Sequence, residues 1–81
     1  MILDEVKAII IYESLKYYNL FEEDEISENE VIITNIGNKW KVAVTDERAS
    51  IITGSEVIFE NESDALDNFL NRLRSFNRIR K

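Results

Sequence analysis

The stretch that decides the fold is Val31–Thr45, VIITNIGNKWKVAVT, in which two runs rich in β-branched residues flank Gly37-Asn38. Residues 31–36 and 39–45 are predicted strands, because such runs favour extended backbone. A two-residue loop that contains glycine is typical of a tight primed turn, since glycine tolerates a positive φ. The centre of the chain is therefore predicted to be a β-hairpin.

The length of this loop also fixes the register of the two strands. It predicts the pairs Asn35–Trp40, Ile33–Val42 and Val31–Val44. The face predicted to meet the helices then carries Val31, Ile33, Trp40, Val42 and Val44. The opposite face carries Ile32, Thr34, Ile36, Lys39, Lys41, Ala43 and Thr45. This second face is partly apolar, so an interaction surface and the ordinary scatter of exposed apolar residues both stay open.

A third strand follows the hairpin, and its extent has two interpretations. Val57–Phe59 is its clearest part. One long strand can begin near Ala49 and contain a bulge at Gly54, or a loop can precede a short strand. We favour the bulged strand.

The last element is predicted to be an amphipathic helix. Asn61 or Ser63 can cap its start. Its apolar stripe, with helical spacing, is Leu66, Phe69, Leu70, Leu73 and Phe76. Its end gathers the basic residues Arg72, Arg74, Arg78, Arg80 and Lys81. Cations suit the negative end of a helix dipole, which explains this basic tail without a ligand.

The first helix is predicted from about Ile2 to Leu20, with two apolar stripes. The main stripe is Ile2, Leu3, Val6, Ile9, Ile10, Tyr17 and Leu20; the narrower one is Ile11, Leu15 and Tyr18. A helix that is apolar on two sides is buried from two directions, by the sheet and by either the second helix or a partner. Glu13 lies on the main stripe and needs a partner there, for which Lys41, Arg48 or a tyrosine hydroxyl are candidates. Glu13 is either a contact acid in a pocket or a structural residue, in an internal ion pair or on a helix that rotates locally; we favour the structural interpretation.

These elements predict an α+β fold of order α-β-β-β-α. The sheet is expected to be three-stranded and antiparallel, with two helices packed on one face. Chains of 81 residues seldom support two hydrophobic cores, so we expect residues 1–81 to form one domain.

Composition argues against most catalytic chemistry. The chain has no cysteine, no histidine and two glycines. It therefore lacks thiolate chemistry, the commonest zinc ligands, the base of a catalytic triad and a glycine-rich phosphate loop. We expect no enzyme activity, no cofactor and no metal site, and a protein that works by binding another macromolecule.

Charge is unevenly distributed along the chain. The net charge is −6, made up of −7 in residues 1–30, −1 in residues 31–60 and +2 in residues 61–81. The densest run is Glu22, Glu23, Asp24, Glu25, Glu28 and Glu30. Such a run repels itself and lacks periodicity, so it is predicted to be a loop. It is either a solvated connection or an electrostatic attraction for a basic partner.

Two other classes of partner are disfavoured by the same charges. Double-stranded-RNA-binding domains share the α-β-β-β-α order, but their second helix begins with lysines that hold phosphate. Glu62, Asp64 and Asp67 stand in that place here, so we expect no direct nucleic-acid binding. The apolar N-terminal run is broken by Asp4, Glu5 and Lys7, so it is neither signal peptide nor membrane span. We expect no membrane contact and a cytoplasmic location.

One family resemblance covers about residues 31–76. The segments that carry it are Trp40-Lys41-Val42, Asp46-Glu47-Arg48, Val57-Ile58-Phe59-Glu60, Asp64-Ala65-Leu66, Phe69-Leu70 and Arg72-Leu73. Together they resemble the small bacterial immunity proteins of polymorphic toxin systems, especially the immunity protein 59 family. The resemblance implies a cytoplasmic antitoxin that binds the toxic domain of a cognate effector and blocks it stoichiometrically.

We therefore expect a cognate toxin, or another basic protein, as the partner. Two alternatives remain: an acidic, phage-encoded inhibitor of a bacterial defence nuclease, and a small structural or adaptor subunit. The latter would form a homodimer through the Ile11, Leu15, Tyr18 stripe or the free sheet face. The candidate partner-binding residues are Glu22, Glu23, Asp24, Glu25, Glu28 and Glu30, then Asp46, Glu47 and Arg48, then Lys39 and Lys41.

Overall fold

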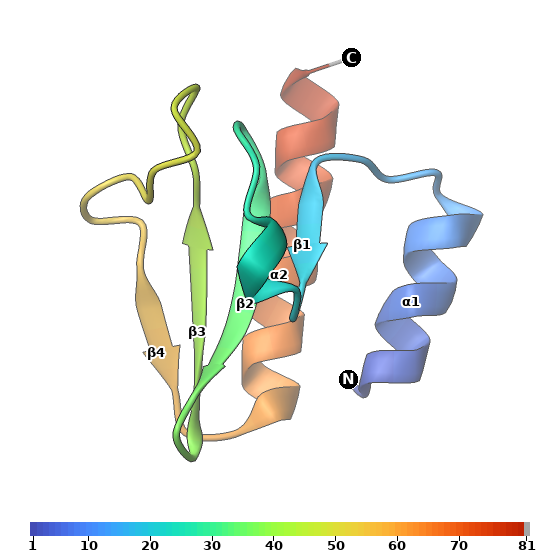
Figure 1. Ribbon diagram of the computed structural model, residues 1–81. Helices are drawn as coiled ribbons and strands as arrows, with labels where there is room; N and C mark the ends of the chain where they lie inside the picture. Colours follow the sequence, from blue (N-terminus) through green and yellow to red (C-terminus); the bar gives the residue numbers. More distant parts are fainter. Residues whose placement is uncertain (81) are drawn as a thin grey trace.

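The computed structural model describes residues 1–80 (Figure 1). Its elements are α1 (Leu3–Tyr12), β1 (Tyr18–Leu20), the 3-10 turn η1 (Glu23–Glu25), β2 (Val31–Ile36), β3 (Lys39–Val44), β4 (Val57–Phe59) and α2 (Glu62–Ile79). The sheet has the order β1-β2-β3-β4; β1 is parallel to β2, and the other neighbours are antiparallel. The α+β class is confirmed. The expected three-stranded antiparallel sheet is wrong, because a fourth, parallel strand is present.

The central hairpin forms as its sequence predicts. β2 and β3 pair in the predicted register, with Asn35 opposite Trp40 and Ile33 opposite Val42. Gly37 has a φ of +65°. A positive φ at the first central residue suits a primed turn, whose twist matches that of the flanking strands.

The predicted first helix was too long. α1 ends at Tyr12, and the left-handed φ values of Ser14 (+53°) and Tyr17 (+66°) break the helical path after it. The chain then runs extended as β1, because it can pair there with the edge of β2. Alternation along β1 turns Leu20 toward the core and leaves Asn19 on the opposite side. The helical spacing in residues 15–20 was therefore accidental.

β4, the strand that follows the hairpin, is short (Val57–Phe59), so the long, bulged strand that we favoured is wrong. Between β3 and β4 the described residues contain an isolated bridge from Thr45 to Ile51. The left-handed φ values of Ala49 (+61°) and Gly54 (+89°) turn the chain away from an extended path. The interpretation with a loop before a short strand is the one confirmed.

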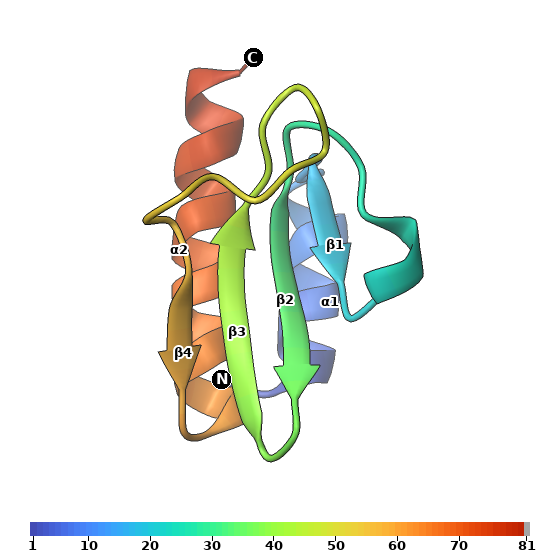
Figure 2. The same ribbon diagram turned by 60° about the vertical axis from the view of Figure 1, so that its left-hand side comes forward.

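Both helices lie on one face of the sheet, as Figure 2 shows. α2 crosses β2, β3 and β4, and α1 lies beside α2 toward β1. The buried core between these layers is Val6, Ile10, Val31, Ile33, Val42, Ala65, Leu66, Phe69 and Leu73. The predicted stripe of the last helix is thus confirmed, and Asn61 caps it by accepting a 2.9 Å hydrogen bond from the backbone N–H of Asp64.

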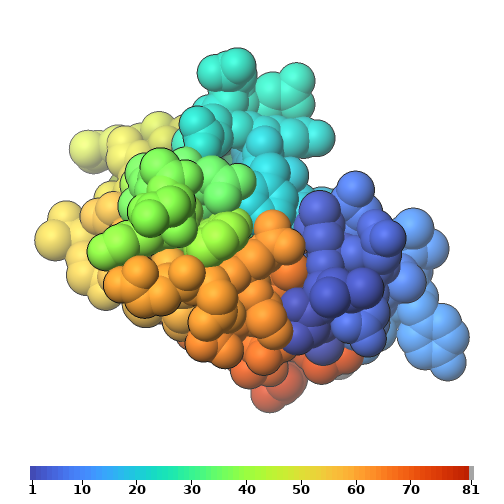
Figure 3. Space-filling model, turned by 90° about the horizontal axis from the view of Figure 1, so that it is seen from below, coloured from blue at the N-terminus to red at the C-terminus, as the bar shows by residue number. Residues whose placement is uncertain are grey.

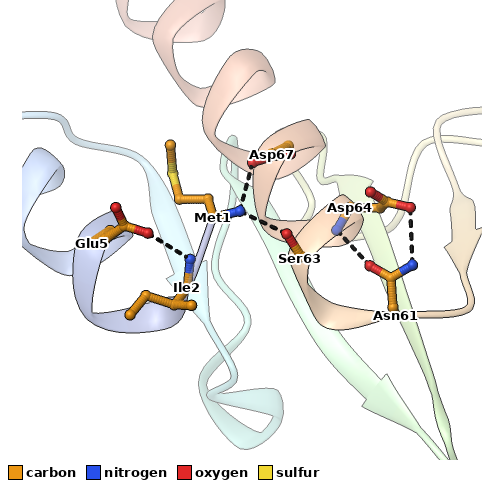
Figure 4. A network of polar contacts seen from close by, with 7 residues as sticks. All are labelled: Met1, Ile2, Glu5, Asn61, Ser63, Asp64 and Asp67. Carbon is orange, nitrogen blue, oxygen red and sulfur yellow. Dashed lines mark hydrogen bonds and ion pairs between the residues drawn. The ribbon is translucent and has the colours of Figure 1, made fainter.

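Polar contacts join the residues on either side of α1 to α2. At one end, the amino group of Met1 contacts Ser63 Oγ at 2.7 Å and Asp67 Oδ1 at 3.3 Å (Figure 4). At the other end, Asn77 accepts from the backbone N–H of Lys16 and donates to its C=O, both at 2.8 Å. These contacts hold the short first helix against the second.

Glu13 forms the internal ion pair that we favoured, but with a different cation. It caps the end of α1, and both of its carboxylate oxygens accept hydrogen bonds from Arg74. These bonds lower the pKa of Glu13 and raise that of Arg74. The candidates Lys41, Arg48 and a tyrosine hydroxyl were wrong, because the partner is Arg74 of α2. Glu13 is also exposed, so it does not lie on a buried face as expected.

The sheet face opposite the helices is covered in part by two connections. Ile32 and Ala43 on this face are fully buried although no helix lies over them. Ile26, from the segment between β1 and β2, and Ile51, from the segment between β3 and β4, line the same small hollow as Ile32. Ile36 lies at the uncovered end and is 45% exposed.

Candidate interaction surface

The acidic segment, residues 22–30, joins β1 to β2 and lies in front of the sheet, on the side away from α2 (Figure 1). It is a connection between two strands, as predicted, and it contains the short turn η1, closed by a 2.9 Å hydrogen bond from the backbone N–H of Glu25 to the C=O of Glu22. The exposed acids of the segment are Glu22, Glu23, Asp24, Glu25 and Glu28. Negative charge is therefore concentrated on a short, turned piece of chain.

Both ends of η1 are fastened, which offsets the repulsion among its carboxylates. Before it, the buried side chain of Asn19 donates to Glu22 C=O at 2.9 Å and accepts from Glu22 N–H at 2.8 Å. After it, the half-buried Ile26 lines the same small hollow as Ile32 of the sheet. Within residues 1–80, no group of three or more Asp or Glu side chains is arranged so that it could hold a metal ion.

Glu30 differs from the other acids of the segment. It is 7% exposed, and its Oε1 accepts a 2.8 Å hydrogen bond from the backbone N–H of Ser27. Thr45 completes this closure, because its hydroxyl donates to Ser27 C=O at 2.8 Å and accepts from Glu30 N–H at 2.9 Å. The buried Glu30 carboxylate therefore helps to fix the conformation of the acidic segment. Its predicted contact with a partner stays a prediction.

The turn that contains Asp46, Glu47 and Arg48 lies beside the acidic segment. The backbone N–H of Asn29 donates to Asp46 C=O at 2.9 Å, which ties the two connections together. The Asp46 carboxylate accepts from the backbone N–H groups of Arg48, at 2.8 Å, and Ser50, at 3.1 Å. These two bonds stabilise the charged form and lower the pKa of Asp46. Asp46 thus organises the turn, whereas Glu47 and Arg48 are exposed.

The two predicted lysines lie on the same face but are paired within the chain. Lys39 contacts Glu60 at 3.3 Å, and Lys41 contacts Glu56 at 3.4 Å, across the β3–β4 pair. Lys41 also lines a hollow of about 190 Å³ together with Glu23. The structure therefore brings Lys41 near the acidic segment and leaves Lys39 at the far end of the hairpin.

A group of exposed apolar residues lies at the end of α1 and on β1. Ile11 and Tyr12, at the end of α1, are 78% and 90% exposed, and Tyr18 on β1 is 40% exposed. The predicted stripe of Ile11, Leu15 and Tyr18 does not exist as one helical face, because the helix ends before Leu15. Ile11 and Tyr18 instead line a groove of about 360 Å³ between α1 and β1. Helical periodicity could not reveal this groove, since it depends on where the helix stops.

The basic end of α2 borders a separate hollow of about 440 Å³ with residues 13–17. Two of its cations have internal contacts: Arg74 binds Glu13, and Arg80 donates to Asn29 Oδ1 at 3.1 Å while lying 4.8 Å from the ring centre of Phe76. Two cations of the basic tail therefore have contacts within the chain, whereas the helix-dipole explanation stays a prediction; Lys81 lies outside the described residues. No helix within residues 1–80 is long and apolar enough to cross a membrane.

Comparison with protein families gives a match over the whole chain. The sequence model of the family described as Immunity protein 59 matches residues 1–81, which is the whole chain and extends beyond the residues 31–76 that carried the resemblance. No curated protein and no solved structure matches the chain significantly.

Proposed function

The chain belongs to the immunity protein 59 family, and we propose that it is a cytoplasmic, single-domain antitoxin that binds one cognate bacterial toxin and blocks it stoichiometrically. Membership of this family indicates an inhibitor of a toxin rather than an enzyme. The match over the whole chain is the observation that carries the proposal. It gives no support to a phage-encoded nuclease inhibitor or to a homodimeric structural subunit.

The acidic segment is our proposed centre of the contact with the toxin. Five exposed carboxylates lie within residues 22–28, on a turn that is fastened at both ends. A turn that is already ordered loses little conformational entropy on binding. A toxin that acts on nucleic acid needs a basic cleft for phosphate, and a fixed row of carboxylates can occupy such a cleft.

The neighbouring charges are proposed to form the rim of this contact. Glu47 and Arg48 are exposed on the turn that is hydrogen-bonded to the acidic segment. Lys41 borders the same hollow as Glu23 and can contact an acid on the partner, whereas Lys39 lies farther away. Charges at a rim mainly set the association rate and the choice of partner.

The test uses the toxin domain encoded beside this chain's gene. Purified chain is titrated against that domain, and we expect inhibition that is complete at a ratio of one to one. A variant with Glu23→Gln, Asp24→Asn and Glu25→Gln should associate at least about tenfold more slowly at low salt, because these charges steer the encounter. Raising the salt concentration should remove most of this difference.

The matched control makes the same change of charge elsewhere. Asp4→Asn, Glu5→Gln and Asp64→Asn together remove three exposed acids outside the acidic segment, and each replacement keeps an acceptor oxygen. This control should associate at close to the wild-type rate. Equal slowing in both variants would show that net charge, and not the acidic segment, attracts the toxin; no inhibition by the wild-type chain would remove the proposed function.

A further inference from the structure

The outer edge of β1 has backbone groups without a neighbouring strand. β1 is the edge strand of the sheet and pairs on its inner side with β2. There, Val31 N–H donates to Tyr17 C=O at 2.9 Å, and Phe21 N–H donates to Ile33 C=O at 3.0 Å. Because these groups alternate in direction along a strand, the N–H and C=O groups of Tyr18 and Leu20 point away from the sheet.

A groove runs beside this edge. It has a volume of about 360 Å³ and lies between α1 and β1; its lining is Ile10, Ile11, Tyr18 and Leu20 together with the charged side chains of Lys7 and Glu22. Figure 3 shows the corresponding notch between α1, in dark blue, and the acidic segment, in teal. An apolar side chain that enters this groove would cover the exposed surfaces of Ile11 and Tyr18, which are 78% and 40% exposed in the free chain.

The negative charge beside the groove favours binding of a strand that carries a basic residue. Glu22, two residues after the end of β1, lines the groove, as does Lys7 from α1; η1 begins at the next residue, Glu23, and adds further negative charge beside Glu22. Side chains two residues apart on a strand lie about 7 Å from each other on the same face. A strand with an apolar residue opposite Tyr18–Leu20 and a lysine or arginine about two residues farther along would satisfy both the groove and Glu22.

We propose that the toxin adds an extended strand to the outer edge of β1, as a fifth strand of the sheet. This inference rests on the proposed function and specifies how the acidic segment and the groove act together. Backbone hydrogen bonds to Tyr18 and Leu20 supply affinity, and the alternating side chains supply specificity. A second copy of this chain is the less favourable occupant, because both copies carry a net charge of −6 and repel each other.

Amide hydrogen exchange tests the strand addition directly. In the free chain, the outward amides of Tyr18 and Leu20 should exchange fast, whereas the amide of Phe21, bonded to Ile33, should be protected. Binding of the toxin domain should slow exchange at Tyr18 and Leu20 by at least about tenfold, because both amides gain a partner. The amide of Phe21 is the internal reference on the inner side of the strand.

A pair of matched variants tests the groove. Ile11→Glu places a charge beside the groove, and Ile79→Glu makes the same change at another exposed isoleucine in the last turn of a helix, 84% exposed. Because both side chains are exposed, both variants should fold. Ile11→Glu should weaken toxin binding by at least about tenfold, and Ile79→Glu should stay within about twofold of the wild type.

The outcomes separate this inference from the proposed function. A complex of wild-type affinity in which Tyr18 and Leu20 exchange as fast as in the free chain would overturn the strand addition and leave the antitoxin function intact. Absence of any complex would overturn both. Protection of these amides in the free chain, together with a dimer in sedimentation, would assign the edge to a second copy instead.

Discussion

The two faces of the sheet are covered by different kinds of structure. On one face, the side chains of Leu66, Phe69 and Leu73 from α2 pack against the apolar side of the hairpin. On the other face, the two connections that flank the hairpin close over Ile32 and Ala43 without a helix. Hydrogen bonds centred on Thr45, rather than a row of apolar residues, join these connections to each other.

We call the face covered by the helices the helix face and the face covered by the two connections the loop face. The helix face mainly determines the stability of the fold, and the loop face determines the shape of the binding surface. Apolar burial is non-directional and shared by many side chains, so the helix face supplies most of the free energy of folding. The loop face depends on a few directional bonds, each with a single donor and acceptor. The proposed binding surface lies on that second face, where geometry is set by individual residues such as Asn19 and Thr45.

The largest effect should come from breaking the helix face at Phe69. Phe69 is fully buried against the hairpin. Phe69→Ala should lower the free energy of unfolding by about 3–5 kcal/mol, because it removes a large apolar side chain and leaves a cavity. Urea denaturation followed by circular dichroism measures this loss. Ile79→Ala, at an exposed position of the same helix, should change it by less than about 0.5 kcal/mol.

A loss at Phe69 below about 1 kcal/mol would contradict the assignment of stability to the helix face. Such a result would mean that α2 is not firmly packed on the sheet. The loop face would then have to contribute more of the stability than its few hydrogen bonds allow.

A smaller, more local effect is expected from breaking the loop face at Thr45. Thr45→Val keeps the shape of the side chain but leaves the N–H of Glu30 and the C=O of Ser27 without their hydroxyl partner. The cost should be about 1–3 kcal/mol, as for other buried groups that lose a partner. Exchange at the amide of Glu30 should become faster, whereas Phe69 and its helix should keep their protection.

Thr53→Val is the matched control for this change, because Thr53 is exposed on the same connection. It should leave both stability and exchange nearly unchanged. If Thr45→Val instead lowers protection throughout α2, the two faces form one cooperative unit and the proposed division between them is wrong.

The sequence predicted those parts of the fold whose information is local. The hairpin follows from Gly37-Asn38 and the β-branched residues around it, and α2 follows from a stripe that repeats with helical spacing. The end of α1 was missed because it depends on contacts made far along the chain, such as that between Lys16 and Asn77. The long third strand was wrong because a left-handed Ala49 is not expected from its residue type.

The candidate surface was predictable in its charge but not in its shape. The acidic run is evident from composition, whereas η1 and the burial of Glu30 depend on Asn19 and Thr45, which carry no periodic pattern. The groove beside β1 was hidden because Ile11 and Tyr18 fit a single helical stripe in the sequence. Short motifs in residues 31–76 were enough to suggest the family, whose match extends over the whole chain.

The smallest change in the free energy of unfolding is expected at Asp46. It should depend on pH and involve the loop face alone. Two backbone N–H groups stabilise the Asp46 carboxylate and hold its pKa below the ordinary value of about 3.9. A lowered folded pKa contributes stability that is fully present above the unfolded pKa and is lost as pH falls through the folded pKa.

Asp46→Asn keeps an acceptor oxygen but cannot titrate. The variant should be less stable than the wild type near pH 7, and the difference should shrink below about pH 4. Urea denaturation of both proteins across this range measures it, and a difference that does not change with pH would show that charge at Asp46 does not hold the turn.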